Sequence, residues 1–366
     1  MNQPVPATWL VSLALGLALT AAGASTDSPW FYRAWQSDEG LPDNTVVGVE
    51  QTPDGFLWVA TQAGLVRFDG MRFQQFAPVT VAGVPTSLIQ ATFLDHEGRL
   101  WVAKDQRAVL CVDKGVTRAF ATQTKLPNVE ARMIVEDNNG AIWVSYLGGD
   151  LVRIYKNEMR SFTSQDGLPG GGTCQLARDN KGQLWFAQGL WLGVFRNGKF
   201  VTLEHSNGQR ITAAHAGGLW FCTKNQIFKY TEGSAPVKVG ELPSNPQLIG
   251  INPTVLYEDR AGRLWIGTRE AGLFSYDGQS LTAVNTSHQE ILSIKEDREG
   301  NMWVGTRGGG LNQVKPKVLE LLALDPRIPF EAVRSICQDT NGVLWAVSQS
   351  GTVLRNVGKE WKPLVS

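Results

Sequence analysis

Short apolar runs separated by glycine-containing turns recur along nearly the whole chain at a regular interval. One tryptophan marks each interval, and successive tryptophans stand 35 to 45 residues apart: Trp58, Trp101, Trp143, Trp185, Trp220, Trp265, Trp303 and Trp345. A glycine lies three residues before each tryptophan, and in six of the eight repeats an aspartate lies three residues before that glycine, as in DHEGRLW and DRAGRLW. Four apolar runs within a period near forty residues are typical of a four-stranded β-propeller blade.

The first repeat, residues 42–76, illustrates how one blade is built. TVVGVE predicts an inner strand, and FLWVAT, GLVRFD and MRFQQF predict three further strands that pair antiparallel across tight turns. In the D-x-x-G turns we expect the aspartate to accept hydrogen bonds from backbone N–H groups and the glycine to adopt a positive φ. We expect the tryptophans to pack between neighbouring blades and to donate the indole N–H to a backbone carbonyl. Their predicted role is structural.

The strand count predicts how the ring closes. WFYRAWQSDEGLP (30–42) is similar to EMRSFTSQDGLP (158–169), an outer strand that leads into the next blade. We therefore expect residues 30–36 to complete the blade of Trp303, which removes an open sheet edge. This predicts an all-β protein with a seven-bladed propeller over residues 25–316 and the first blade of a second ring over residues 317–366. A single eight-bladed ring, with residues 317–366 as the eighth blade, is the alternative.

The N-terminus has the features of an export signal. Residues 9–22 form an almost unbroken apolar run, and Ala22-Gly23-Ala24 follows as an A-x-A cleavage motif. We expect residues 1–24 to be a signal peptide that is cleaved after Ala24, which makes the mature chain periplasmic. The run is shorter than the ~20 residues of a membrane-spanning helix. Because residues 1–10 contain no lysine or arginine, an uncleaved anchor is the alternative.

The repeat resembles the two-component regulator propeller repeat, which builds the exported sensory region of sensor and hybrid histidine kinases. The segments that carry the resemblance are GLPDNTVVGV (40–49), DGFLWVATQAGLVRFDG (54–70), GRLWIGTREAGLFSYDG (262–278) and GNMWVGTRGGGLNQV (300–314). Two repeats depart from the pattern, because Thr52 replaces the aspartate in the first and AHAGGLWFCTKNQIFKY (214–230) lacks it in the fifth. The resemblance implies signal transduction by ligand sensing, a homodimer whose geometry responds to the ligand, and C-terminal phosphorelay modules in a full-length protein.

Charge and cysteine content narrow the range of partners and cofactors. The chain has 34 basic and 34 acidic residues, so it lacks the cationic excess that would attract nucleic acid. The cysteines lie in different repeats and form no C-x-x-C motif, which argues against a metal site: Cys111, Cys174, Cys222 and Cys337. We expect free, buried thiols, with a disulfide between Cys174 and Cys222 as the alternative. No metal, cofactor or catalytic residue is predicted.

The candidate binding surface is the end of the ring opposite the D-x-x-G turns. There the loop after each tryptophan strand should lie beside the crossover between blades, because alternate turns of antiparallel strands share one end. Polar or cationic side chains recur in these loops and crossovers: Asn44, Gln62, Lys104, Asn128, Lys224, Arg269 and Arg307. Loops of one rigid ring converge on its axis, so these side chains are suited to bind the hydroxyls or carboxylates of a sugar acid.

The sequence therefore predicts a non-enzymatic, exported propeller, the sensor portion of a two-component receptor. It recognises a small molecule, and the resemblance makes an oligosaccharide the leading ligand class. Two alternatives stand beside this hypothesis. One is a stand-alone periplasmic propeller enzyme that acts on polysaccharide as a lyase or glycosidase, and the other is a protein-binding scaffold.

Overall fold

The structure, a computed structural model, describes residues 28–76, 88–104, 108–121, 126–156, 158–206, 210–243, 251–317, 332–357 and 360–364. Within these ranges the chain forms eight four-stranded antiparallel sheets and two short 3₁₀ turns, η1 (Ser37–Glu39) and η2 (Ser164–Asp166). The predicted all-β class and the four-stranded blade are confirmed. The predicted signal peptide and its cleavage site after Ala24 lie outside the described residues, as do residues 318–324, which were expected to open a second ring.

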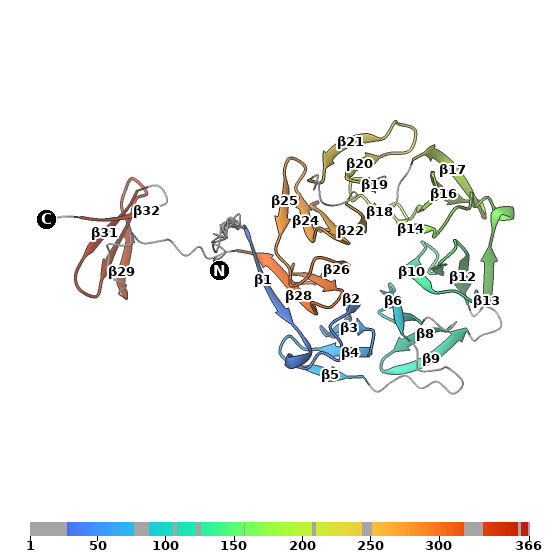
Figure 1. The fold of residues 1–366 in the computed structure, drawn as a ribbon, viewed down its shortest axis with the longest axis horizontal. Helices are drawn as coiled ribbons and strands as arrows, with labels where there is room; N and C mark the ends of the chain where they lie inside the picture. Colours follow the sequence, from blue (N-terminus) through green and yellow to red (C-terminus); the bar gives the residue numbers. More distant parts are fainter. Residues whose placement is uncertain are drawn as a thin grey trace, which may run out of the picture.

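Six blades each use four consecutive strands, with the innermost strand first and the outermost last (Figure 1). The first three blades are β2 (Val46–Gln51), β3 (Leu57–Thr61), β4 (Gly64–Phe68) and β5 (Phe73–Gln75); β6 (Ile89–Leu94), β7 (Leu100–Lys104), β8 (Ala108–Asp113) and β9 (Val116–Ala121); and β10 (Ala131–Glu136), β11 (Ile142–Tyr146), β12 (Leu151–Tyr155) and β13 (Glu158–Phe162). The next three are β14 (Gln175–Arg178), β15 (Leu184–Gln188), β16 (Trp191–Arg196) and β17 (Lys199–His205); β18 (Arg210–Ala213), β19 (Leu219–Thr223), β20 (Gln226–Tyr230) and β21 (Val237–Glu241); and β22 (Pro253–Glu258), β23 (Leu264–Thr268), β24 (Leu273–Tyr276) and β25 (Leu281–Val284).

The seventh blade joins the two ends of the ring. Its inner strands are β26 (Ile291–Glu296), β27 (Met302–Thr306) and β28 (Leu311–Pro316), and its outer strand is the N-terminal β1 (Trp30–Trp35). β1 pairs antiparallel with β28 from Trp30 opposite Pro316 to Trp35 opposite Leu311. Neighbouring inner strands touch in succession, and β26 of this blade contacts β2 of the first. The pairing predicted for the N-terminal strand is therefore present, and β1 covers the outer edge of β28.

The eighth sheet contains β29 (Val333–Gln338), β30 (Leu344–Ser348), β31 (Val353–Val357) and β32 (Glu360–Pro363). None of these four strands pairs with a strand of the ring (Figure 1). Every residue of β29 is exposed, unlike the inner strands of the ring. The domain boundaries at residues 25–316 and 317–366 remain predictions.

The repeated tryptophans pack between blades as predicted, but the expected acceptor of their indole N–H is wrong. In five ring blades Nε1 donates to the D-x-x-G aspartate six residues earlier, not to a backbone carbonyl, at 2.7–2.8 Å. In the first blade Trp58 donates to Thr52 Oγ1 at 3.0 Å. The second carboxylate oxygen accepts the turn's backbone N–H groups, as predicted. Asp95 Oδ1 accepts from Glu97 and Arg99 at 3.0 and 2.8 Å.

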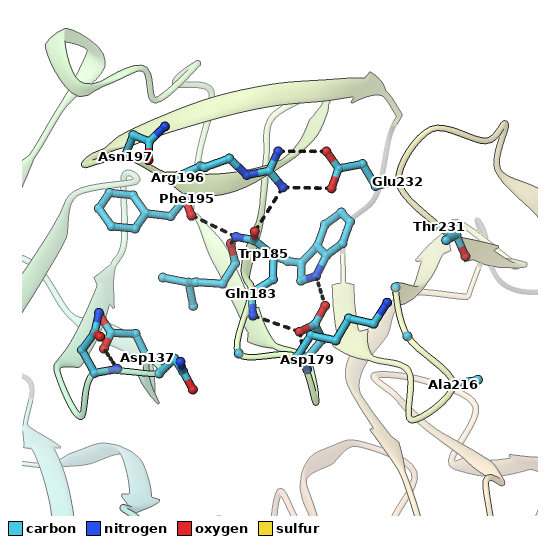
Figure 2. A pocket seen from close by; sticks show the side chains of 17 residues that line it. Asp137, Asp179, Gln183, Trp185, Phe195, Arg196, Asn197, Ala216, Thr231 and Glu232 are labelled. Atoms are coloured by element: carbon cyan, nitrogen blue, oxygen red, sulfur yellow. Dashed lines mark hydrogen bonds and ion pairs between the residues drawn. The ribbon is translucent and has the colours of Figure 1, made fainter.

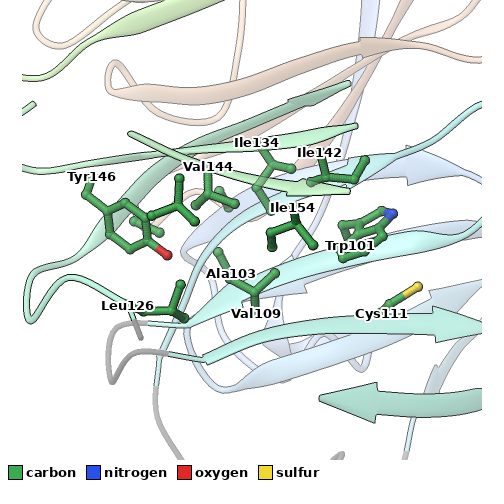
Figure 3. Close-up of a cluster of buried hydrophobic side chains, with 13 residues drawn as sticks. Trp101, Ala103, Val109, Cys111, Leu126, Ile134, Ile142, Val144, Tyr146 and Ile154 are labelled. Carbon is green, nitrogen blue, oxygen red and sulfur yellow. The ribbon is translucent and has the colours of Figure 1, made fainter. Parts of the chain in front are cut away.

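The hydrophobic core is divided into clusters that lie between successive blades. Figure 3 shows the cluster between the second and third blades, where Trp101 and Val109 pack against Ile134, Val144 and Ile154. Burial of such side chains stabilises a blade only when its neighbour is present, which is why the blades stack into one ring.

The four cysteines are free, so the alternative of a disulfide between Cys174 and Cys222 is wrong. Cys111, Cys174 and Cys222 are buried, as expected. Cys337 is exposed, which corrects the prediction that all four thiols are buried. It lies on β29, whose face is not covered by another described blade.

Candidate functional site

The loops that follow the tryptophan strands lie beside the crossovers, at the end of the ring predicted to bind ligand. Each of three such loops donates a backbone N–H to the segment just before its own inner strand: Gln62 to Thr45 at 3.1 Å, Arg269 to Asn252 at 3.0 Å and Arg307 to Glu290 at 3.0 Å. These bonds fix the loops against the rigid inner strands. Side chains on the loops are therefore held in a defined arrangement around the axis.

The seven predicted site residues all lie at this end of the ring. Asn128, Lys224, Arg269 and Arg307 are exposed, and Asn44, Gln62 and Lys104 are half-buried. Lys224 has a positive φ of 53° in the short turn between β19 and β20. The structure contains no ligand against which their binding role can be checked, so that role remains a prediction.

Asn44 and Arg307 have structural partners that limit their freedom. Asn44 accepts the N–H of Ser37 through Oδ1 at 2.8 Å, and its carbonyl accepts the N–H groups of Gly308 and Gly310. Asn44 therefore positions the crossover from the seventh blade to the first. Arg307 pairs with Glu290 at 2.9 Å between Nε and Oε1, although 53% of its side chain stays exposed.

Arg269 lies in a cationic cluster with two arginines that sequence reasoning missed. The Arg210 guanidinium, at the start of β18, donates from Nε to the carbonyl of Thr254 at 2.6 Å. The backbone N–H of Arg269 donates to the carbonyl of Asn252, so the backbone of Arg269 and the guanidinium of Arg210 both bond to residues 252–254. Arg132, on β10, is the third member. It is the extra residue of a β-bulge between Ala131 and Met133.

The cluster has an electrostatic consequence for Arg210. Burial lowers the pKa of its guanidinium, and the positive charges of Arg269 and Arg132 lower it further. Arg132 is partly neutralised by Glu130, whose Oε2 lies 2.7 Å from Nη2. A ligand carboxylate at this position would relieve the repulsion among the guanidinium groups, which bind carboxylates in a bidentate manner.

The cavity that the described residues form lies at the opposite end of the ring (Figure 2). It has a volume of about 560 Å³ and is lined by the D-x-x-G turns of the third, fourth and fifth blades and by the third-to-fourth-strand turns of the fourth and fifth. Arg196 spans its rim by pairing with Glu232 at 2.9 Å and with Gln183 at 3.1 Å. None of the seven predicted site residues lines this cavity. The sequence analysis assigned this end of the ring only to turn formation.

Comparison with known proteins connects this architecture to a family. Residues 40–63, 247–270 and 286–308 match the family model described as two component regulator propeller. The extracellular domains of two putative hybrid two component systems from B. thetaiotaomicron are similar in structure, each at 18% identity with TM-scores of 0.65 and 0.66. The matches cover 91% and 92% of this chain but 46% and 49% of those chains. The chain thus spans about half the length of these extracellular domains.

Enzymes of the same fold are also similar in structure. A streptogramin B lyase matches at 16% identity and a TM-score of 0.66, over 79% of this chain and 98% of the lyase. Identities this low establish the fold alone. No curated protein matches the sequence. Among the described residues no helix is long and apolar enough to cross a membrane. The protein is a β-propeller, and three segments of it match the model described as two component regulator propeller.

Proposed function

We propose that this chain is the exported, ligand-sensing part of a two-component receptor and that its crossover end binds an acidic oligosaccharide. The observation that carries the proposal is that the Arg210 guanidinium and the Arg269 backbone both bond to residues 252–254, while the charges of Arg269 and Arg132 lower the pKa of Arg210. Similarity to extracellular domains of two-component systems supports the sensing role.

The chemistry of the cluster favours an anionic ligand. Three guanidinium groups from three different blades gather in a chain whose overall charge is balanced, so the local positive charge is not a reflection of composition. A uronic-acid carboxylate would pair with Arg269, and sugar hydroxyls would bond with polar neighbours such as Asn128 and Gln62. Ligand binding would then be transmitted to C-terminal modules of a longer protein.

Thermal unfolding with a panel of acidic and neutral oligosaccharides tests the proposal. A ligand that binds only the folded state raises the melting temperature, and the rise grows with the ratio of free ligand to its Kd. We expect acidic oligosaccharides to raise it and neutral ones of equal length to have little effect. Arg269→Ala should weaken binding about tenfold, since a charged hydrogen bond is lost.

Arg72→Ala is the matched control, because Arg72 is an exposed arginine in the turn between β4 and β5, at the other end of the ring. Equal weakening by both variants would point to nonspecific charge attraction and count against the site. Turnover of a polysaccharide by the purified chain would instead favour the enzyme alternative, to which the lyase likeness in fold is relevant.

A further inference from the structure

In five of the D-x-x-G turns the aspartate accepts two backbone N–H groups, from the residues two and four positions later. Asp179 shows the arrangement in the fourth blade, where Oδ1 accepts from Lys181 and Gln183 at 2.9 Å each. The same pair of bonds occurs at Asp95, Asp137, Asp259 and Asp339. The two backbone N–H groups of this turn therefore point to one position, which a carboxylate oxygen occupies.

The fifth repeat keeps the turn but lacks its carboxylate, because Ala214 stands in place of the aspartate. Part of the missing function is supplied by Glu258 of the next blade. Its Oε1 accepts the indole N–H of Trp220 at 3.0 Å, and its Oε2 accepts the N–H of His215. Glu258 thereby replaces the aspartate oxygen that faces the tryptophan.

The other half of the aspartate's role is not replaced. The N–H groups of Ala216 and Gly218, which correspond to the two donors of the other turns, have no acceptor among the described residues. Gly218 is buried, and a buried N–H without a partner is costly and uncommon in folded proteins. Ala216 and Gly218 both line the cavity of Figure 2.

A cation lies beside these donors. Lys181, from the turn of the fourth blade, lines the same cavity, and its Nζ lies 4.0 Å from the point where a Cβ on Gly217 would stand. It forms no ion pair with any residue that the structure describes. The other charged residues that line the cavity already have partners. Arg196 pairs with Glu232, Asp137 pairs with Arg153, and Asp179 accepts hydrogen bonds from its own turn and from Trp185.

We propose that this cavity is a second ligand site, which binds the carboxylate of a small organic acid or sugar acid. One oxygen of the ligand accepts the N–H groups of Ala216 and Gly218, as an aspartate does in the other turns, and Lys181 contributes the positive charge. The site lies at the end of the ring opposite the arginine cluster, so it is independent of the function proposed above. A volume of about 560 Å³ accommodates a monosaccharide-sized acid.

Amide NMR on the purified chain, labelled with ¹⁵N-alanine and ¹⁵N-glycine, tests the proposal. Acetate, glucuronate and glucose are titrated at constant ionic strength. We expect acetate and glucuronate to give saturable downfield shifts of the Ala216 and Gly218 amide protons, and glucose to give none. Equal affinity for the two acids would identify a free carboxylate as the ligand, whereas tighter glucuronate binding would identify a sugar acid.

Three variants make the test specific. Lys181→Gln removes an exposed charge and should weaken carboxylate binding about tenfold. Lys199→Gln, on the outer strand of the same blade, should leave it unchanged. Ala214→Asp should abolish binding by restoring the internal carboxylate.

Three outcomes would overturn the proposal. They are the absence of saturable shifts with either acid, equal affinity in the Lys181→Gln and unsubstituted chains, and unchanged binding by a folded Ala214→Asp variant. Should Ala214→Asp fail to fold, the comparison of Lys181→Gln with Lys199→Gln still decides.

Discussion

Trp220 donates its indole N–H to Oε1 of Glu258 in the following blade, at 3.0 Å, whereas the other ring tryptophans bond to a side chain of their own turn. Glu258 is the last residue of its inner strand. The last residue of three other inner strands also links two blades, because its side chain accepts a backbone N–H from the turn of the preceding blade: Gln51 from Arg298, Glu136 from His96 and Glu296 from Arg260. The fifth blade therefore uses the inter-blade hydrogen bond found in other blades, and Glu258 in addition accepts the indole N–H of Trp220.

Glu258→Ala should destabilise the protein more than an ordinary surface substitution. It leaves the buried indole N–H of Trp220 and the N–H of His215 without an acceptor, so we expect a loss of about 3 kcal/mol in the free energy of unfolding. Urea denaturation measures the loss, with an unchanged m-value as the check that the folded state is intact. Glu258→Gln retains one acceptor oxygen and should cost less.

Ala214→Asp should rescue the Glu258→Ala variant. The new carboxylate would stand where the aspartate stands in the other turns and would accept the N–H of Trp220. We expect the double variant to regain most of the lost stability, whereas Ala214→Asp alone should gain less because Glu258 already accepts the Trp220 N–H. Additive losses in a double-mutant cycle would contradict this account.

Asp259→Ala tests the role of the turn aspartate in a blade where this residue makes all three of its hydrogen bonds. Asp259 accepts the indole N–H of Trp265 and the N–H groups of Ala261 and Arg263. Removing it should cost about 3 kcal/mol or more, because three donors lose their partner at once. Asp259→Asn keeps an acceptor oxygen and should retain part of the stability. Equal urea midpoints for both variants would show that the carboxylate geometry is unimportant.

The repeat alone was sufficient to predict the blades, their strand order and the use of residues 30–35 as an outer strand. The blades and their strand order depend on the period and the turn residues, which are local in sequence, and the outer strand was recognised by its similarity to residues 158–169. The acceptor of the indole N–H was not predicted, although the constant six-residue spacing between Asp95 and Trp101, and its counterparts, was visible. Whether the aspartate carboxylate comes within hydrogen-bond distance of the indole N–H depends on side-chain geometry, which sequence spacing does not give.

The candidate site was predictable only in part. Strand alternation placed Gln62, Arg269 and Arg307 at one end of the ring. Arg132 and Arg210 were missed because a β-bulge and a neighbouring blade, neither readable from sequence, bring them to Arg269. The cavity at the other end combines turns of three blades that are adjacent only in the closed ring.

The cysteines should differ sharply in reactivity. Burial raises the pKa of the Cys111 and Cys222 thiols to about 12, and it also raises that of Cys174. Thiolate is the reactive species, so these three should resist a thiol reagent in the folded protein. Cys337 is exposed and should react. A colorimetric thiol assay should therefore count one thiol in the native chain and four after denaturation, and Cys337→Ser should remove the native signal.

Glu50 and Lys295 form an ion pair at the junction where the ring closes. Nζ of Lys295 lies 2.7 Å from Oε2 of the buried Glu50, across the seventh and first blades. Burial holds the pKa of Glu50 above its ordinary value of 4.5, although the charge and hydrogen bond of Lys295 oppose that rise. Burial lowers the pKa of Lys295, but the charge of Glu50 and its hydrogen bond with Lys295 together raise the pKa above 10.5.

Lys295→Met should destabilise the ring in a pH-dependent manner. Removing one partner leaves an uncompensated buried carboxylate, which costs about 3–5 kcal/mol near neutral pH. In the variant the folded-state pKa of Glu50 lies further above the unfolded-state value, so the folded state binds the proton more tightly. The free energy of unfolding of the variant should then fall as the pH rises from the unfolded-state pKa of Glu50 to its folded-state pKa. The stability loss relative to the unsubstituted chain should shrink as the pH is lowered toward about 5. Urea unfolding across that range measures it. Lys238→Met, which breaks the exposed ion pair with Glu241, is the control and should change the free energy of unfolding little at any pH. If the stability loss of Lys295→Met were also independent of pH, Glu50 would not be buried as a charge.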